Sequence, residues 1–181
     1  MSALGHKRTF AAMLGMSAKY NAECYMNSSN LNAPNVKIIP PLVYLAGLIL
    51  GSIVSIWIPT TIAPRPAAWT IGALLIFIGV GLAGSAIIKF KLTGTTIRPD
   101  RGSNSLVVEG PYKITRNPMY LGLALAYLGI GIAEQSIWAL ILLPVVLLII
   151  QRKAIEPEEA FLTHRFGAEY ISYKSLVRRW L

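Results

Sequence analysis

The hydrophobic positions of this chain are gathered into four continuous stretches, at about 42–58, 67–88, 118–133 and 137–151. Continuous apolar runs of this length are typical of helices that cross a bilayer, whereas strict alternation would indicate strands. The third and fourth stretches are short for a full span, and only the polar residues 134–136 separate them. The pattern therefore predicts an all-α integral membrane bundle of about four spans, whose last two form a short hairpin.

Small residues recur on two of these stretches at a spacing of four. Gly47 and Gly51 lie in the first stretch, and Gly81 and Ser85 lie in the second. Small residues four apart lie on one face of a helix and let a second helix approach closely. We therefore expect the first two helices to pair with each other.

The polar segments divide the rest of the chain. Residues 1–36 have no apolar run and no clear period, which predicts a disordered tail before a membrane domain at 37–181. Residues 89–117 form a long internal loop, and such a loop among short connections favours a functional role. Residues 152–181 are charged and amphipathic, and we expect them to form a helical cap on the cytoplasmic side.

Helix signals are readable within this last segment. Pro157 is typical of a first helical position, the pair Glu158-Glu159 suits the first turn, and Gly167 is a stop signal. Tyr170 and Tyr173 are three apart on a following helical stretch, a spacing that is more typical of packing than of ligand binding.

Composition and charge further limit the class of protein to which this chain can belong. The chain is 54% hydrophobic and 14% charged, too apolar for an ordinary soluble domain. The net charge of +9 comes from residues that flank the apolar stretches, which points to membrane orientation rather than to nucleic acid. Lysines and arginines are concentrated in both terminal tails and in the long loop, so we expect both termini in the cytoplasm, at the inner membrane if the organism is bacterial. The single Cys24 and the distant His6 and His164 predict no metal site.

The segment 110–122 carries the candidate chemistry. It reads Gly-Pro-Tyr-Lys-Ile-Thr-Arg-Asn-Pro-Met-Tyr-Leu-Gly, where a basic loop turns into the third apolar stretch. Asn117-Pro118 is a helix start signal, and Arg116 stands immediately before it as a permanent cation. Tyr112 and Tyr120 add aromatic rings. A cation, aromatic rings and exposed helix-terminal N-H groups suit a ligand that combines an anionic group with a ring.

Several segments together resemble the isoprenylcysteine carboxyl methyltransferase family and its phospholipid methyltransferase relatives. They are Leu106-Val107, Gly110-Pro111-Tyr112, Arg116 to Tyr120 with Gly122, Glu158-Glu159, and Phe166-Gly167 with Tyr170 and Tyr173. The resemblance implies a small membrane enzyme that binds S-adenosyl-L-methionine between the long loop, the hairpin start and the C-terminal segment. It assigns cofactor binding to Asn104, Ser105, Leu106, Val107, Tyr112, Asn117, Pro118, Met119, Tyr120 and Glu158, with Glu159 as an alternative acid.

Two positions depart from the family pattern. Asn117 stands where the family usually has histidine, so it can hydrogen-bond but cannot act as an acid. Ala154 stands where the prenylcysteine enzyme has a substrate-binding arginine. Arg152 or Lys153 is the candidate replacement, and the departure weakens the case for a prenylated cysteine.

The chemistry of the cofactor fits these residues. Arg116 suits its carboxylate, and Glu158 or Glu159 suits its ammonium group. Methyl transfer is an in-line displacement that depends on alignment, so Arg116 and Asn117 are expected to position the reactants without forming a covalent intermediate. The membrane spans favour a lipid-like acceptor, either the carboxyl group of a prenylcysteine-like compound or a phospholipid amine.

Other functions remain compatible with the sequence. Sterol-reductase-like membrane enzymes that use NADPH resemble the C-terminal architecture, and the cations of the long loop suit a 2'-phosphate. A non-catalytic scaffold that assembles partners through its glycine-rich helices is the third hypothesis. Taken alone, Arg116 is equally typical of a residue at the headgroup level, and Glu158-Glu159 after a proline is typical of any helix start.

Overall fold

The structure, a computed structural model, describes residue 36 and residues 38–93 and 106–181. Within these ranges it contains helices and no strands, which confirms the predicted fold class. The predicted tail, apart from residue 36, and the cofactor candidates Asn104 and Ser105 lie outside the described residues. The helices are α3 (Pro40–Trp57), α4 (Arg65–Leu92), η2 (Gly110–Lys113), α5 (Pro118–Ala133), α6 (Ile137–Ile150), η3 (Gln151–Ile155), α7 (Glu156–Phe166) and α8 (Ala168–Leu176).

Local signals in the sequence set several helix ends. A proline stands in the first turn of α3, α4 and α5, where a missing N-H group costs no hydrogen bond. Ser136 begins α6, and its side chain accepts a hydrogen bond from the backbone N-H of Ala139 at 3.2 Å. Gly167 ends α7 with a φ of 54°, a left-handed conformation that glycine adopts without steric cost.

The surfaces of α3 and α4 are those of membrane helices. By length and composition α3, α4 and the continuous helix Ile137–Phe166 can each cross a bilayer. Large apolar side chains stand exposed along α3 and α4; Leu45 is 50% exposed and Phe77 is 78% exposed. In water such a surface would be an aggregation hazard, whereas lipid covers it at no cost. The chain is therefore a membrane protein.

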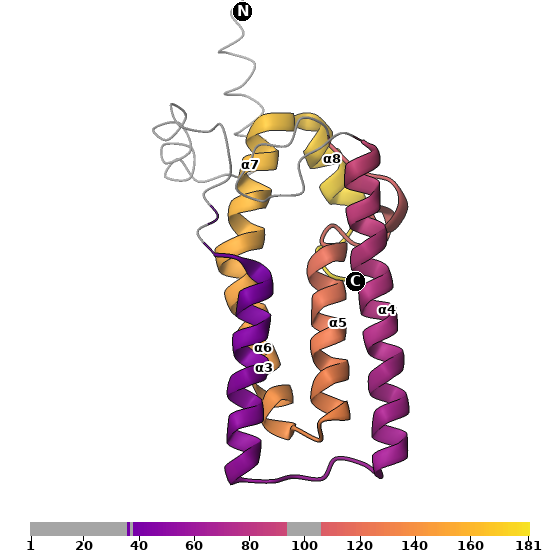
Figure 1. Ribbon diagram of the computed structural model, residues 1–181. Helices are drawn as coiled ribbons and strands as arrows, with labels where there is room; N and C mark the ends of the chain where they lie inside the picture. The colour runs from indigo at the N-terminus through magenta and orange to yellow at the C-terminus, as the bar shows by residue number, and fades with distance from the viewer. Residues whose placement is uncertain (1–35, 37, 94–105) are drawn as a thin grey trace, which may run out of the picture. The chain divides into compact units, whose positions relative to one another are not determined.

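Helix α5 is shorter than the three helices that can cross a bilayer, and it lies inside the bundle. Its 16 residues make a helix of about 24 Å, and none of them is exposed. Helix α5 packs most extensively against α4, and it also contacts α6 and α3. Helices α3 and α6 pack against each other. Figure 1 shows α5 beside α4, with α6 beside α3.

The predicted pairing of the first two helices is wrong. Gly47 and Gly51 face α5 and α6, where a Cβ at Gly51 would meet Ala139 at 2.5 Å. Gly81 faces no atom within 4 Å in the described part of the chain. The glycines that hold α4 to α5 are instead Gly72 and Gly79, which face Gly129 and Gly122 on α5. The sequence offers small residues on several helix faces, so their spacing alone does not identify the partner.

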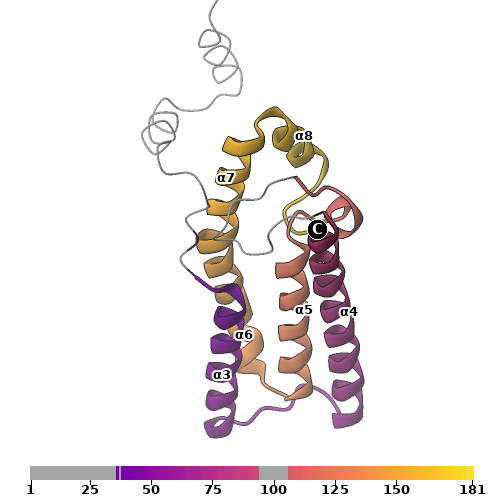
Figure 2. The same ribbon diagram turned by 45° about the horizontal axis from the view of Figure 1, so that its top comes forward.

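The C-terminal segment also differs from the prediction. We expected the fourth span to end at 151 and a new helix to open at Pro157, but α6, η3 and α7 form one helix of 30 residues. The turn η3 is π-helical, and the N-H of Glu156 donates to the carbonyl of Gln151 within it. A widened turn lets the helix continue past a proline that would otherwise break it. Helix α8 then turns back over the bundle, as Figure 2 shows.

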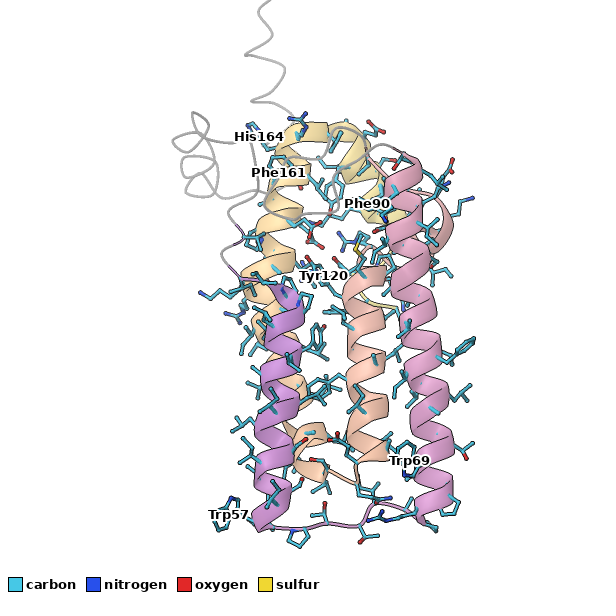
Figure 3. The ribbon with its side chains drawn as sticks, in the orientation of Figure 1. Trp57, Trp69, Phe90, Tyr120, Phe161 and His164 are labelled. Atoms are coloured by element: carbon cyan, nitrogen blue, oxygen red, sulfur yellow. The ribbon has the colours of Figure 1, made fainter. Side chains whose placement is uncertain are left out.

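The connections 58–64 and 134–136 meet at the end of the bundle that we call the hairpin end. Gln135 is the centre of their contact, because its side chain accepts from the N-H groups of Ile62 and Ala63 and donates to the carbonyl of Ala63. Ser55 and Ser136 share a hydrogen bond of 2.7 Å. Figure 3 shows Trp57 and Trp69 at this end and Tyr120 and Phe90 at the opposite end, which we call the site end.

Candidate functional site

A small cavity of about 40 Å³ lies at the site end, among residues that are far apart in the chain. The end of α4, the segment 106–107, η2, the start of α5, α7 and α8 all contribute side chains to its wall. The lining residues are Phe90, Leu106, Val107, Tyr112, Arg116, Asn117, Glu158, Glu159, Leu162, Tyr170 and Tyr173.

Arg116 is the cation of this cavity. It precedes Asn117 and Pro118, which begin α5 as predicted, and its side chain is only 9% exposed. Its Nη1 lies 3.2 Å from Oε1 of Glu159, yet its Nε and Nη1 make no hydrogen bond to any described residue. Buried N-H groups without acceptors are rare because their desolvation is not compensated. The guanidinium therefore has hydrogen-bonding capacity left for an anionic ligand.

Glu159 is already neutralised by its neighbours. Arg179 donates to both of its carboxylate oxygens, from Nε at 3.0 Å and from Nη2 at 2.7 Å. Arg116 and Lys174 add ion pairs at 3.2 Å and 3.8 Å. A carboxylate held in this paired geometry is satisfied and fixed. Glu159 acts as a structural anchor in this arrangement.

Glu158 has different contacts from the adjacent Glu159. It lies 21 residues after Ile137, about 32 Å along the helix, a distance greater than the thickness of a hydrocarbon layer of about 30 Å. Its Oε2 accepts a hydrogen bond from the hydroxyl of Tyr120 at 3.1 Å. Burial raises the pKa of Glu158 to about 7, the hydrogen bond from Tyr120 opposes this shift, and the charge of Glu159 adds to it. Among the described residues Glu158 thus has no cationic partner like those of Glu159, and a positive ligand group would suit it.

Aromatic rings form part of the cavity wall. Phe90 and Tyr112 lie with ring centroids 5.3 Å apart, and Tyr170 and Tyr173 lie 6.1 Å apart. The hydroxyl of Tyr173 donates to the carbonyl of Tyr112 at 2.7 Å, which joins α8 to η2. Burial raises the pKa of Tyr173 to about 12 and that of Tyr112 further, so both phenols stay neutral at physiological pH. This part of the wall is aromatic and uncharged, which suits a planar ring or a cation.

Residues Val177–Leu181 contact the start of α5 and the helix α7, and we call them the C-terminal strap. The backbone N-H of Arg116 donates to the carbonyl of Arg178 at 3.0 Å. The carbonyl of Arg179 accepts from the Thr115 hydroxyl at 3.0 Å and from the Asn117 amide at 2.9 Å. The strap therefore holds the start of α5 against α7. In Figure 2 the C-terminus lies beside the starting end of α5.

Most of the site residues predicted from the sequence come together. Leu106, Val107, Tyr112, Arg116, Asn117, Glu158 and Glu159 all line the cavity, and Tyr120 reaches it through Glu158. Pro118 is buried at the start of α5, and Met119 packs against the aromatic cluster behind the cavity. Neither of these two is among the described lining residues.

The two residues predicted to bind the substrate do not line the cavity, and five residues of the site were not predicted from the sequence. Arg152 and Lys153 are exposed on η3, away from the cavity that the described residues form. The residues that sequence reasoning did not assign to the site are Phe90, Leu162, Tyr170, Tyr173 and Arg179. The shared face of Tyr170 and Tyr173 was visible as a spacing of three, but a charged tail gives no sign that Arg179 returns to Glu159.

The fold and the cavity together define an integral membrane protein with a small cavity of charged and aromatic side chains at one end of its helices. A family model described as phospholipid methyltransferase matches residues 67–169, more than half of the 181-residue chain, and the chain belongs to this family. It is therefore a methyltransferase of the membrane by family, as the resemblance of the sequence implied. Comparisons with curated proteins and with solved structures give no match.

Proposed function

We propose that this protein transfers a methyl group from S-adenosyl-L-methionine to a lipid-like acceptor at the site end of its bundle. The observation that carries the proposal is that one aromatic-walled cavity contains both Arg116 and Glu158. Within the part of the chain that the structure describes, Arg116 keeps two nitrogen atoms without a hydrogen bond and Glu158 accepts a hydrogen bond from Tyr120 alone. An amino-acid group presents a carboxylate and an ammonium at short range, and a nucleoside presents a planar ring. The cavity offers Arg116 to the carboxylate, Glu158 to the ammonium group and aromatic side chains to the planar ring.

The two adjacent glutamates take separate roles in this proposal. Glu158 binds the ammonium group of the cofactor, because it is the acid of this pair that has no cationic partner among residues 38–93 and 106–181. Glu159 holds Arg179 and Arg116 in place and is a positioning residue. Asn117 also positions, since its amide holds the carbonyl of Arg179 and its neighbour Arg116 points into the cavity. The backbone of Leu106-Val107 and the ring of Tyr112 complete the cofactor pocket.

The size of the cavity sets a condition on binding. Sites for ligands of nucleoside size hold roughly 300–1,000 Å³, far more than the cavity of about 40 Å³. One wall must therefore move when the cofactor binds. Helix α8 contributes Tyr170 and Tyr173 to the wall, and hydrogen bonds and ion pairs join α8 and the C-terminal strap to the rest of the site end, so we expect these two segments to be displaced.

The reaction needs only alignment of the two substrates. A lone pair of the acceptor attacks the methyl carbon in line with the carbon-sulfur bond, and the bonding pair leaves with sulfur as S-adenosylhomocysteine. If the acceptor is an amine, it must first lose a proton. The family description and the neutral, buried Ala154 support a phospholipid amine over a prenylcysteine carboxyl, which would call for a cation at that position.

Charge supports a cytoplasmic location of the site. Within the described residues the cations Lys89, Lys91 and Lys113 stand at the site end, together with those of the C-terminal segment, and Arg65 stands at the hairpin end. Cytoplasmic flanks of membrane helices carry the excess of positive residues. We propose that both termini are cytoplasmic and, in a bacterium, that the bundle lies in the inner membrane.

Titration of detergent-purified protein with S-adenosylhomocysteine tests the cofactor. We expect binding that Arg116→Ala and Glu158→Ala each weaken strongly and that Gln135→Asn, at the hairpin end, leaves unchanged. Binding of NADPH instead would favour a reductase, and a protein that binds neither would contradict the proposal. The scaffold hypothesis predicts the reverse sensitivity, with function lost in Gly47→Leu and retained in Arg116→Ala.

The acceptor is tested separately. The purified protein is incubated with methyl-labelled cofactor and vesicles that contain either phosphatidylethanolamine or a prenylcysteine analogue. Label in the phospholipid headgroup supports the amine acceptor, whereas a base-labile methyl ester identifies the carboxyl acceptor.

A further inference from the structure

The helix Ile137–Phe166 changes its winding just before the two glutamates of the site. Residues Gln151–Ile155 form the π-helical turn η3, in which the N-H of Glu156 donates to a carbonyl five residues back. A π-helical turn contains one residue more than an α-helical turn. Every side chain after η3 is therefore rotated relative to its place in an uninterrupted α-helix.

The rotation is large enough to decide where the glutamates point. Ile150 lies on the core face of α6 with 0% exposure. Glu158 is eight residues further, and at about 100° per residue a plain α-helix would turn it about 80° away from that face. Glu159 would then stand about 180° away, on the opposite side of the helix. Neither placement fits a cavity that both residues line.

The extra residue in the π-helical turn η3 explains the observed orientation of α7. Seven effective residues then separate Ile150 from Glu158 and leave it about 20° from the core face, with Glu159 about 80° from it. Leu162 returns to within about 20° of the same face, and it also lines the cavity. The observed lining residues of α7 are those that the shifted register predicts.

We propose that the π-helical turn is the element that directs Glu158 and Glu159 into the site, and that Pro157 maintains this turn. Pro157 has no N-H to donate, and its ring crowds the carbonyl of Lys153 four residues back. A wider turn at that point relieves the crowding. Pro157 is thus a positioning residue, which acts through the winding of the helix and not by contact with the cofactor. As far as cofactor binding is concerned, this inference rests on the proposed function.

The extra residue can be removed without changing the register. Deleting one residue from η3 converts it to an α-helical turn and leaves everything after it in the observed orientation. Inserting one residue rotates α7 by about 100° and takes the glutamates out of the cavity. An ordinary α-helix would respond to both changes alike, since each would rotate it by the same angle. The asymmetry is therefore specific to the π-helical turn.

The experiment compares a deletion of Lys153 with an insertion of one alanine after Lys153. Lys153 is exposed, and it has no part in the proposed cofactor site. Because Pro157 crowds a plain α-helical turn, the deletion is also made together with Pro157→Ala. We expect S-adenosylhomocysteine to bind at least one deletion variant within about threefold of the wild type, and the insertion variant at least about 100-fold more weakly.

A second readout reports the register without the cofactor. Ala160 is exposed on α7, whereas Phe161 is 3% exposed. In a Cys24→Ser background, Ala160→Cys provides the one thiol of the chain. We expect maleimide to label it quickly in the wild type and in the deletion variants. In the insertion variant residue 160 takes the place of Phe161, and labelling should be at least about tenfold slower.

The outcomes separate the two proposals. A wild-type protein that does not bind S-adenosylhomocysteine overturns the proposed function, and the labelling rates still decide the register. Equal loss of binding in the deletion and insertion variants, or equal labelling rates in both, overturns the role of η3. Retained binding in the insertion variant does so as well.

Discussion

The two ends of the bundle use polar residues in opposite ways. At the hairpin end the side chain of Gln135 makes three hydrogen bonds to the backbone of 62–63, and the hydroxyl of Thr60 donates to the carbonyl of Gln135. At the site end Arg116 keeps two nitrogen atoms without a hydrogen bond among the described residues, and Glu158 has one hydrogen bond. Both ends join loops between apolar helices, but only one has its polar groups satisfied.

This difference distinguishes polar groups that stabilise the fold from polar groups that are available to bind a ligand. A satisfied network stabilises the fold and has nothing to offer a ligand, whereas an unsatisfied buried group reduces stability and is retained where a ligand uses it. Glu159 and Glu158 show the same contrast at adjacent positions. We therefore expect substitutions at the hairpin end to change stability alone, and substitutions of Arg116 and Glu158 to change binding first.

Arg116→Ala should give the largest effect. We expect the affinity for S-adenosylhomocysteine to fall about 500-fold, because the ligand carboxylate loses a buried, charge-assisted partner. The melting temperature should stay the same or rise, since the guanidinium is desolvated with N-H groups unpaired. Calorimetric titration and thermal unfolding in detergent measure the two quantities.

Arg116→Lys is the matched control. It keeps the charge but loses the planar fork, so it should restore only part of the affinity. A strong loss of stability in Arg116→Ala would mean that Arg116 serves the fold, and the contrast between the two ends would fail.

Glu159→Gln should act on the strap. It removes the charge that Arg179 contacts with two hydrogen bonds, and we expect the free energy of unfolding to fall by about 2 kcal/mol. The C-terminal residues should become sensitive to carboxypeptidase, which mass spectrometry detects. Glu158→Gln, one position earlier, should leave the strap protected. Equal protection in both variants would contradict the division of roles between the two acids.

Glu158 should make cofactor binding depend on pH. Its pKa is raised to about 7 by burial, so below pH 7 it is protonated and cannot attract the ammonium group of the ligand. Affinity should therefore rise as the pH rises, by on the order of fivefold to tenfold between pH 6 and pH 7.5. Titration at several pH values measures this rise. In Glu158→Gln the slope should disappear, and an unchanged slope there would assign the titration to another group.

Sequence patterns were sufficient where the physical cause is local. Continuous apolar runs determine which segments enter a bilayer, and the proline and glycine signals at Pro118 and Gly167 determine helix ends wherever they stand. The segment Arg116-Asn117-Pro118 carried a local reason to place a cation beside a helix start. These features depend on neighbouring residues alone.

The features that were missed depend on tertiary contacts. Pro157 looked like a helix start because a proline inside a helix is normally disruptive, and the π-helical turn that accommodates it has no sequence signature. The pairing of Arg179 with Glu159 joins residues twenty positions apart across a turn. For the same reason the charge argument alone did not distinguish Glu158 from Glu159, and only the resemblance to the family favoured Glu158.

Gln135→Asn should give the smallest effect and tests the hairpin end. Gln135 has a φ of 59°, a left-handed conformation that asparagine also tolerates, so the substitution isolates the side-chain hydrogen bonds from backbone strain. The shorter side chain cannot reach Ile62 and Ala63, and we expect the free energy of unfolding to fall by about 1 kcal/mol, because the released groups face solvent and bond to water. Thermal unfolding measures this loss, and S-adenosylhomocysteine affinity should stay within about twofold of the wild type. A change in affinity larger than the change in stability would show that the two ends are coupled through α5 and would remove the distinction between polar groups that stabilise the fold and polar groups that are available to bind a ligand.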